Sequence, residues 1–154
     1  MLHVVLVEPQ IPPNTGNVIR LCANTGARLH LVEPLGFTLD DARLRRAGLD
    51  YHEWADVQVH ETWIEAVRDI PVDRRFGLST RATRRCHDCS FRDGDALIFG
   101  AETHGLSESI RAQLGNNQLL RLPMRPQSRS LNLANAVAIC VFEAWRQIGF
   151  AGAR

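Results

Sequence analysis

Short apolar runs of strand length recur along the chain and alternate with segments of helical periodicity. Residues 2–7 (LHVVLV) form an almost continuous apolar run, residues 18–22 place apolar side chains at helical spacing before Gly26, and residues 29–32 form a second apolar run. Continuous rather than alternating hydrophobicity is typical of parallel strands that are buried on both faces. The order strand, helix, strand therefore predicts an α/β fold with a mainly parallel sheet flanked by helices.

The same patterns predict the remaining elements. We expect strands at residues 76–79, 96–99 and 119–122, and helices at residues 38–48, from Thr62 onward, at 107–114 and at 131–148. Thr62 and Glu65 have the spacing of a capping box, and Gly115 is suited to end the helix that precedes it. Because 154 residues fit one domain, we expect residues 1–154 to form a single domain.

Composition and motif content exclude several classes of protein. A hydrophobic fraction of 45% with 23% charged residues indicates a globular chain. The apolar opening contains His3, lacks a basic flank and ends at Glu8, so it is too short for a signal peptide or a membrane span, and we expect a cytoplasmic protein without membrane contact. The absence of lysine and of the G-x-G-x-x-G and G-x-S-x-G patterns argues against lysine nucleophiles, P-loop ATPases, dinucleotide enzymes and serine hydrolases.

Charge is unevenly distributed along the chain. Residues 33–73 hold ten acidic residues and four Arg, a balance of −6, so the net charge of +1 leaves +7 on the rest. Residues 74–92 contain six Arg and one acidic residue, and residues 109–142 contain four Arg and none. Arginine clusters suit a polyanion, because the planar guanidinium matches phosphate. Solvated faces of surface helices are the alternative explanation.

The last expected helix, at residues 131–148, has no polar face over two of its turns. Residues 136–142 (AVAICVF) are all apolar, whereas a helix on the surface of a monomer shows a polar stripe. We therefore expect a second copy of the chain to pack against this helix about a twofold axis, as a homodimer. The alternative is a central helix covered by its own chain.

The four cysteines include one short motif, Cys86-His87-Asp88-Cys89. A single C-x-x-C lacks the second ligand pair of a structural zinc site, so we assign no metal, and a zinc or thiol protein is the minor alternative. Cys22 and Cys140 lie in apolar helical patterns and are expected in the core.

Three loops rich in Gly, Pro and Asn each follow a buried strand directly. They are residues 8–17 (EPQIPPNTGN), 100–106 (GAETHGL) and 123–132 (PMRPQSRSLN). Ligands of open α/β sheets bind at the carboxyl ends of the strands, where these loops are expected to lie. The three loops are therefore predicted to form one composite site.

Together and in this order, the three loops resemble the signature motifs of the SPOUT superfamily of RNA 2′-O-methyltransferases. The chain is most similar to the small bacterial tRNA (cytidine/uridine-34 2′-O)-methyltransferases, and the similarity includes residues 45–55 (RRAGLDYHEWA) and 123–138 (PMRPQSRSLNLANAVA). The departures are local. Ala101 and Ser107 stand where the family commonly has proline, and His104 stands where it has a basic residue.

The resemblance implies a carboxy-terminal trefoil knot, which binds S-adenosylmethionine in a bent form within an obligate dimer. True knots are rare, so the sequence pattern alone argues against one. Carried over by position, the cofactor-binding residues are Leu78, Gly100, Leu122 and Ser130. Leu78 and Leu122 end buried strands and are placed to enclose an adenine, or to fill the core. Ser130 is also expected to cap the last helix.

The resemblance assigns catalytic roles to Arg20, Asn14, Glu102 and Asn132. Methyl transfer from a sulfonium is an in-line displacement, so the protein must orient the ribose 2′-oxygen and assist loss of its proton. Because arginine is always protonated, Arg20 is expected to stabilise the developing alkoxide rather than to act as the base. A surface role for Arg20 and a turn or cap role for Asn14 are the alternatives.

Cationic side chains near the three loops are expected to contact tRNA at its anticodon stem-loop. These RNA-binding candidates are Arg81, Arg84, Arg85, Arg125 and Arg129. Phe37, Trp54 and His104 are candidates to stack on an unpaired base. The predicted activity is methylation of the 2′-hydroxyl of the wobble nucleotide, cytidine or uridine 34. The alternatives are another tRNA or rRNA position, or a SPOUT-fold RNA-binding protein without catalysis.

Overall fold

The computed structural model describes residues 1–40, 42–45 and 57–154, and its central feature is a sheet of seven strands in the order β3-β2-β1-β6-β4-β7-β5. All strand pairs are parallel. The strands are β1 (His3–Val7), β2 (Arg28–Val32), β3 (Val57–His60), β4 (Arg75–Leu78), β5 (Arg84–Arg85), β6 (Ala96–Phe99) and β7 (Leu119–Arg121). The helices are α1 (Pro12–Thr25), α2 (Ala42–Arg45), α3 (Trp63–Ala66), α4 (Glu108–Leu114) and α5 (Leu133–Gln147).

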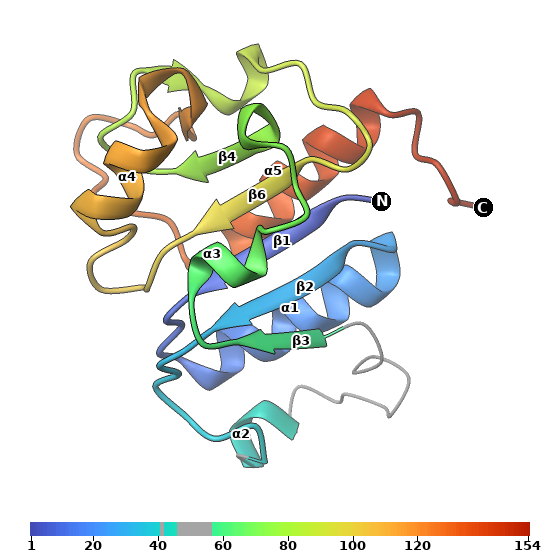
Figure 1. The fold of residues 1–154 in the computed structure, drawn as a ribbon, viewed down its shortest axis with the longest axis vertical. Helices are drawn as coiled ribbons and strands as arrows, with labels where there is room; N and C mark the ends of the chain where they lie inside the picture. Colours follow the sequence, from blue (N-terminus) through green and yellow to red (C-terminus); the bar gives the residue numbers. More distant parts are fainter. Residues whose placement is uncertain (41, 46–56) are drawn as a thin grey trace.

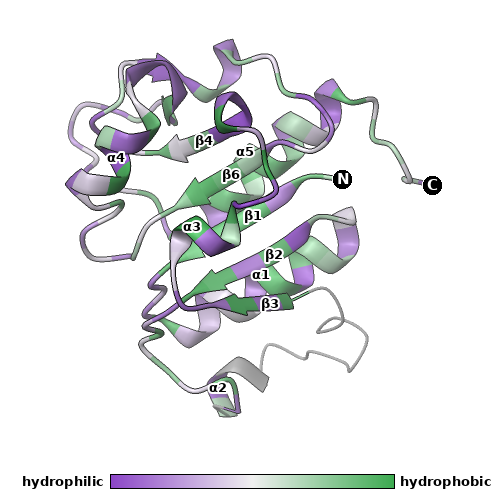
Figure 2. Ribbon diagram, in the orientation of Figure 1, coloured by the Kyte–Doolittle hydropathy of each residue, from purple (hydrophilic) through white to green (hydrophobic). Residues whose placement is uncertain are grey.

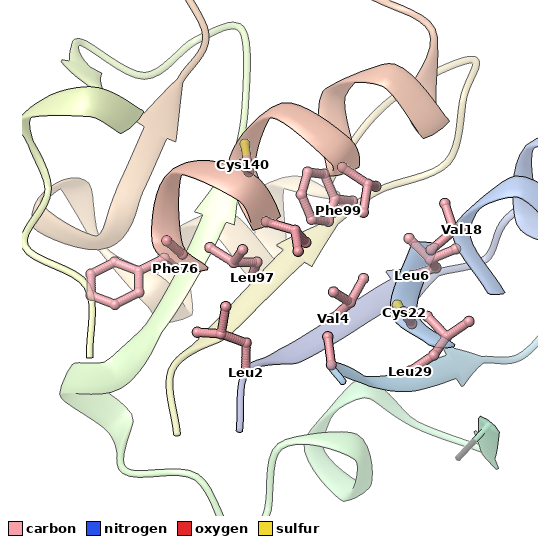
Figure 3. Close-up of a cluster of buried hydrophobic side chains, with 14 of the residues drawn as sticks. Leu2, Val4, Leu6, Val18, Cys22, Leu29, Phe76, Leu97, Phe99 and Cys140 are labelled. Carbon is pink, nitrogen blue, oxygen red and sulfur yellow. The ribbon is translucent and has the colours of Figure 1, made fainter. Parts of the chain in front are cut away.

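Helices cover both faces of the sheet, so the predicted α/β architecture is confirmed (Figure 1). The larger hydrophobic cluster lies between the sheet and the helices α1 and α5, and includes Leu6, Leu97 and Cys140 (Figure 3). A second cluster packs α3 and α4 against the opposite face. Strand β6 is hydrophobic along its whole length, as burial on both faces requires (Figure 2).

Three helix boundaries differ from the sequence prediction. Helix α1 begins at Pro12, within the expected loop, because proline at the first helical position loses no hydrogen bond there. Of the helix expected at residues 38–48, the structure shows α2, and residues 41 and 46–48 lie outside the described part. Helix α5 is capped by Asn132 and not by Ser130, because Asn132 Oδ1 accepts a hydrogen bond from the backbone N–H of Asn135 at 3.2 Å.

The expected caps at Thr62 and Gly115 are present, and Ser107 provides a cap that was not predicted. The Thr62 side chain accepts from the N–H of Glu65 at the start of α3, and the Ser107 side chain accepts from Ile110 at the start of α4. Gly115 ends α4. Among the described residues, none of the helices combines the length and the hydrophobicity that a membrane-spanning segment requires.

The edge strands β3 and β5 were not predicted from the sequence. β3 (VQVH) is partly exposed and β5 has two residues, so neither contains the continuous apolar run that marks a buried strand. The parallel arrangement brings the carboxyl ends of all seven strands to one edge of the sheet (Figure 1).

Candidate functional site

A cavity of about 490 Å³ lies at the carboxyl ends of β4, β6 and β7. Its walls come from residues 78–81, residues 99–106, Arg111, Leu122, Met124, residues 129–131, Leu133 and Ala136. Two of the three loops singled out in the sequence therefore line it. Its volume falls in the range of about 300–1,000 Å³ that is usual for small-molecule sites.

The remaining loop, residues 8–17 after β1, joins the cavity through Glu102. One carboxylate oxygen of Glu102 accepts the backbone N–H of Gln10 at 2.8 Å, and the other accepts that of Ile11 at 3.0 Å. The side-chain amide of Asn14 donates to Glu102 at 3.3 Å. Because the first N–H groups of a helix have no partner within it, a carboxylate is well placed beside the start of α1.

Asn14 also joins the first loop to the third. The Nδ2 group of Asn132 donates to Oδ1 of Asn14 at 2.9 Å, while Asn132 Oδ1 caps α5. Asn14 is 7% exposed, so its amide is committed to these partners. Glu102, Asn14 and Asn132 thus form one hydrogen-bonded chain, and the predicted convergence of the three segments is present in the structure.

Gly100 is required by a close approach within its own loop. A Cβ atom at this position would lie 2.0 Å from the carbonyl carbon of Gly105 and 2.1 Å from the nitrogen of Leu106. The loop turns back on itself through a hydrogen bond of 2.8 Å from the N–H of Gly105 to the carbonyl of Ala101. Gly105 has a φ of +67°, which glycine adopts readily.

All four predicted cofactor-binding residues line the cavity, namely Leu78, Gly100, Leu122 and Ser130. The two leucines also pack against the larger core cluster, so the two interpretations offered for them are compatible. Ser130 is exposed at the rim and does not cap α5.

Arg20 is exposed on α1 and does not line the cavity of its own chain.

The five predicted RNA-binding arginines differ in their positions relative to the cavity. Arg81 and Arg129 line the cavity, and Arg125 is exposed outside it. Arg84 donates to the carbonyl of Asn117 at 2.9 Å, and Arg85 forms an ion pair of 2.7 Å with Asp88. The Asp88 carboxylate raises the pKa of Arg85, and Arg85 lowers that of Asp88. Arg84 and Arg85 therefore have local structural partners outside the cavity.

The sequence did not point to Arg111, which lines the cavity and donates to the carbonyl of Leu106. Its place in the acid-free stretch 109–142 was the available signal. Of the proposed stacking residues, His104 lines the cavity, Phe37 lines a separate cleft, and Trp54 lies outside the described residues together with most of the 45–55 motif.

The four cysteines are free and buried. Cys86 donates to Cys140 across an Sγ–Sγ distance of 3.7 Å, and burial raises the pKa of Cys22 to about 12. Cys22 and Cys140 belong to the larger core cluster, as predicted. Within residues 1–40, 42–45 and 57–154, no group of three or more His, Cys, Asp or Glu side chains is arranged to hold a metal ion.

The cavity lies at the carboxyl edge of a parallel sheet, beside the tight loop turn that requires Gly100, and the loop before α5 completes its wall. Together with the fold, this cavity defines a methyltransferase domain of the SPOUT class. The chain belongs to the SpoU rRNA methylase family, whose sequence profile matches residues 1–142.

Relatives and solved structures agree with this assignment. The chain is 61% identical to a tRNA (cytidine(34)-2′-O)-methyltransferase of Burkholderia pseudomallei, over 99% of each chain. A solved structure that gives insights into the 2-OH methylation of C/U34 on tRNA shares 43% identity, with a TM-score of 0.87 over 97% of each chain. The SpoU methyltransferase AviRb of Streptomyces viridochromogenes, solved with AdoMet, shares 26% identity and a TM-score of 0.81, over 96% of this chain and 60% of that one.

Proposed function

We propose that this chain is a single SPOUT domain that transfers a methyl group from S-adenosylmethionine to the ribose 2′-hydroxyl of nucleotide 34 in the anticodon loop of tRNA. The observation that carries the proposal is the hydrogen-bonded chain Glu102–Asn14–Asn132, which joins all three loops beside one cavity. The names of the full-length relatives support the choice of substrate. Such a protein works in the cytoplasm.

The cavity fits S-adenosylmethionine in size and in the chemistry of its walls. Leu78 and Leu122 supply apolar surface for the adenine, and the Ser130 hydroxyl and the backbone of the 100–106 loop supply polar groups. The cofactor supplies an activated methyl group on a sulfonium. This chain supplies binding and orientation of the cofactor and of the ribose.

We assign Glu102, Asn14 and Asn132 to positioning. The Glu102 carboxylate holds the start of α1 against the cofactor loop, and Asn14 transmits that position to Asn132 at the start of α5. Since a misplacement of about 1 Å can cost 10²-fold in rate, a rigid link among the three loops favours transfer.

We propose that the active protein is a homodimer through α5. Ile139 and Phe142 on α5 are 40% and 48% exposed, although they are apolar, and α5 packs beside α1. Arg20 lies on α1 outside its own cavity. In the dimer, Arg20 of one subunit serves the cavity of the other, where it stabilises charge on the ribose oxygen. The carboxy-terminal knot implied by the family is part of the same proposal.

Arg81 and Arg129 at the cavity supply the phosphate contacts nearest to the reacting ribose, and Arg125 extends them. Contacts of this kind release counterions, so RNA affinity should fall steeply with salt while cofactor affinity changes little.

Isothermal titration with S-adenosylmethionine, followed by a methyl-transfer assay on unmodified tRNA, tests the proposed function. We expect saturable binding and incorporation approaching one methyl group per tRNA. Cofactor binding without transfer to any RNA would refute the proposed methyltransferase activity and indicate a SPOUT-fold RNA-binding protein without catalysis.

A further inference from the structure

A second cleft opens at the carboxyl ends of β2 and β3, away from the cofactor cavity. Its residues are Glu33, Pro34, Leu35, Phe37, Thr38, Leu39 and Glu61. None of them lines the first cavity, and the proposed function gives none of them a role. Because all strands are parallel, this cleft and the cofactor cavity lie on the same edge of the sheet.

One residue, Gln10, connects the cleft to the cavity. Its backbone N–H donates to Glu102, and its side-chain oxygen accepts from the Thr103 hydroxyl at 2.7 Å. On its other side, Gly36 packs so closely that a Cβ there would lie 2.7 Å from the Cα of Gln10. The Gly36 N–H also donates to the carbonyl of Pro9 at 2.9 Å. The loop at residues 33–39 is therefore seated on the segment that supports the cofactor loop.

The cleft combines two carboxylates with an aromatic ring. Glu33 and Glu61 are exposed, and no ion pair engages either of them among the described residues. Phe37 is half-buried and packs against the core on one side while lining the cleft. The carboxylates repel phosphate, but they accept hydrogen bonds from amino groups, as Glu and Asp do from N4 of cytosine. The ring of Phe37 is suited to stack on a base.

We infer that this cleft holds an unpaired nucleobase with an exocyclic amino group, from the same RNA loop that carries the methylated ribose. Phe37 stacks on the base, and Glu33 and Glu61 accept from its amino group. The cationic side chains at the first cavity hold the phosphates, and the acidic cleft on the same edge of the sheet selects a base. This inference rests on the proposed function and adds to it a site that discriminates between bases.

Whether RNA affinity rises or falls when carboxylates are removed from the cleft distinguishes base recognition from general electrostatic repulsion. Removing negative charge from a protein tightens its non-specific binding to a polyanion. If the cleft reads a base, the double variant Glu33→Gln/Glu61→Gln should instead weaken RNA binding. Asp69→Asn/Asp73→Asn is the matched control, because it also removes two exposed carboxylates from the same acidic part of the chain, outside both the cleft and the cavity.

The experiment uses anticodon stem-loop RNAs in which each unpaired cytidine or adenosine is replaced in turn by uridine or inosine. RNA dissociation constants are measured without turnover, and KM and kcat at saturating cofactor. For the wild-type protein we expect one replacement to weaken binding about tenfold, which corresponds to about 1.4 kcal/mol. The Gln double variant should lose most of that discrimination, because a neutral amide oxygen accepts more weakly than a carboxylate, while kcat and cofactor affinity stay unchanged.

Phe37→Leu is the second variant, since leucine preserves apolar packing but removes the stacking ring, and its melting temperature verifies the fold. It should raise KM severalfold for all the RNAs. Unchanged RNA affinity and base preference in both cleft variants, tighter binding by the Gln double variant, or an equal change in Asp69→Asn/Asp73→Asn would overturn the inference. Absence of methyl transfer by the wild-type protein would refute the proposed function alone, because the binding measurements do not require turnover.

Discussion

Asn132 donates a hydrogen bond of 2.9 Å to Asn14, across 118 positions of sequence. Asn14 in turn donates to Glu102, so its single amide side chain is shared by the loop after β6 and the loop before α5. A neutral amide is the group that can donate to a carboxylate on one side and accept from an amide on the other. The identity of residue 14 therefore couples all three loops of the site.

Asn14→Asp should destabilise the protein and abolish most methyl transfer. The substitution keeps the shape of the side chain but places a second carboxylate against Glu102 in a position that is 7% exposed. The lost donor and the buried like charge should lower the free energy of unfolding by about 1–3 kcal/mol at neutral pH. Thermal melts at pH 7 give the comparison, and an unchanged melting temperature would contradict the role of this amide.

Arg20→Ala should retain the affinity for S-adenosylmethionine and lose about 10²–10³-fold in kcat, the magnitude typical of removing one group that stabilises transition-state charge. Titration calorimetry and single-turnover transfer measure the two quantities separately. Full activity would remove Arg20 from the mechanism.

Mixed dimers test whether Arg20 acts across the subunit interface. Ser130→Trp fills the cavity from an exposed position, so it should block the cofactor without disturbing the core. Neither this variant nor Arg20→Ala should be active alone. A heterodimer of the two should regain one working site, and an inactive heterodimer would show that Arg20 serves its own cavity.

Gly100→Ala should weaken both cofactor binding and stability, because the added methyl group meets backbone atoms that cannot move aside. Overpacking of this kind typically costs about 1–3 kcal/mol. Gly26→Ala is the control: Gly26 has a φ of +72° but nothing within 4 Å of an added Cβ, so it should cost about 1 kcal/mol and leave the cavity intact. Equal cofactor affinity in both variants would show that cofactor binding does not require the tight loop turn at Gly100.

Stability should fall in mild acid because of a row of histidines on β1, β2 and β3. His30 Nε2 lies 3.0 Å from His3 Nδ1, and His30 Nδ1 lies 2.9 Å from His60 Nε2. Burial, followed by the charges of His3, His60 and Arg28, lowers the pKa of His30 from 6.5 to about 4. The unfolded chain therefore binds this proton before the folded chain does.

The contribution of His30 to the free energy of unfolding is then complete above pH 6.5 and is lost as the pH falls from 6.5 towards 4. His30→Gln should flatten the dependence of stability on pH in this window. Urea unfolding of both proteins at pH 7.5, 6, 5 and about 4 measures the free energy of unfolding across this window. Parallel curves for the two proteins would show that His30 is not the group responsible.

The elements predicted correctly are those whose sequence patterns reflect burial. β1, β2, β4, β6 and β7 were found because central parallel strands must be apolar on both faces. The edge strands β3 and β5 were not predicted, because they contain polar residues. The start of α1 was missed because Pro12 and Pro13 are typical of turns, although proline also suits the first turn of a helix.

The site was partly predictable for a similar reason. Gly100, Leu78, Leu122 and Ser130 lie at strand ends or in loops that the parallel topology must bring together. Arg84 and Arg85 could not be separated from Arg81 by sequence, because their partners, the carbonyl of Asn117 and the carboxylate of Asp88, depend on the local fold. The cleft at Glu33 and Glu61 was also not predicted from the sequence, since its two carboxylates follow different strands.

The most direct test of the central claim is methyl transfer to two anticodon stem-loop RNAs that differ only in the 2′ group of nucleotide 34. With S-adenosylmethionine and the purified protein, we expect the all-ribose RNA to gain one methyl group, mapped by mass spectrometry to the ribose of nucleotide 34. The RNA with a 2′-deoxy nucleotide at that position should gain none. Methylation of the deoxy RNA, or of another nucleotide in the ribose RNA, would contradict the account.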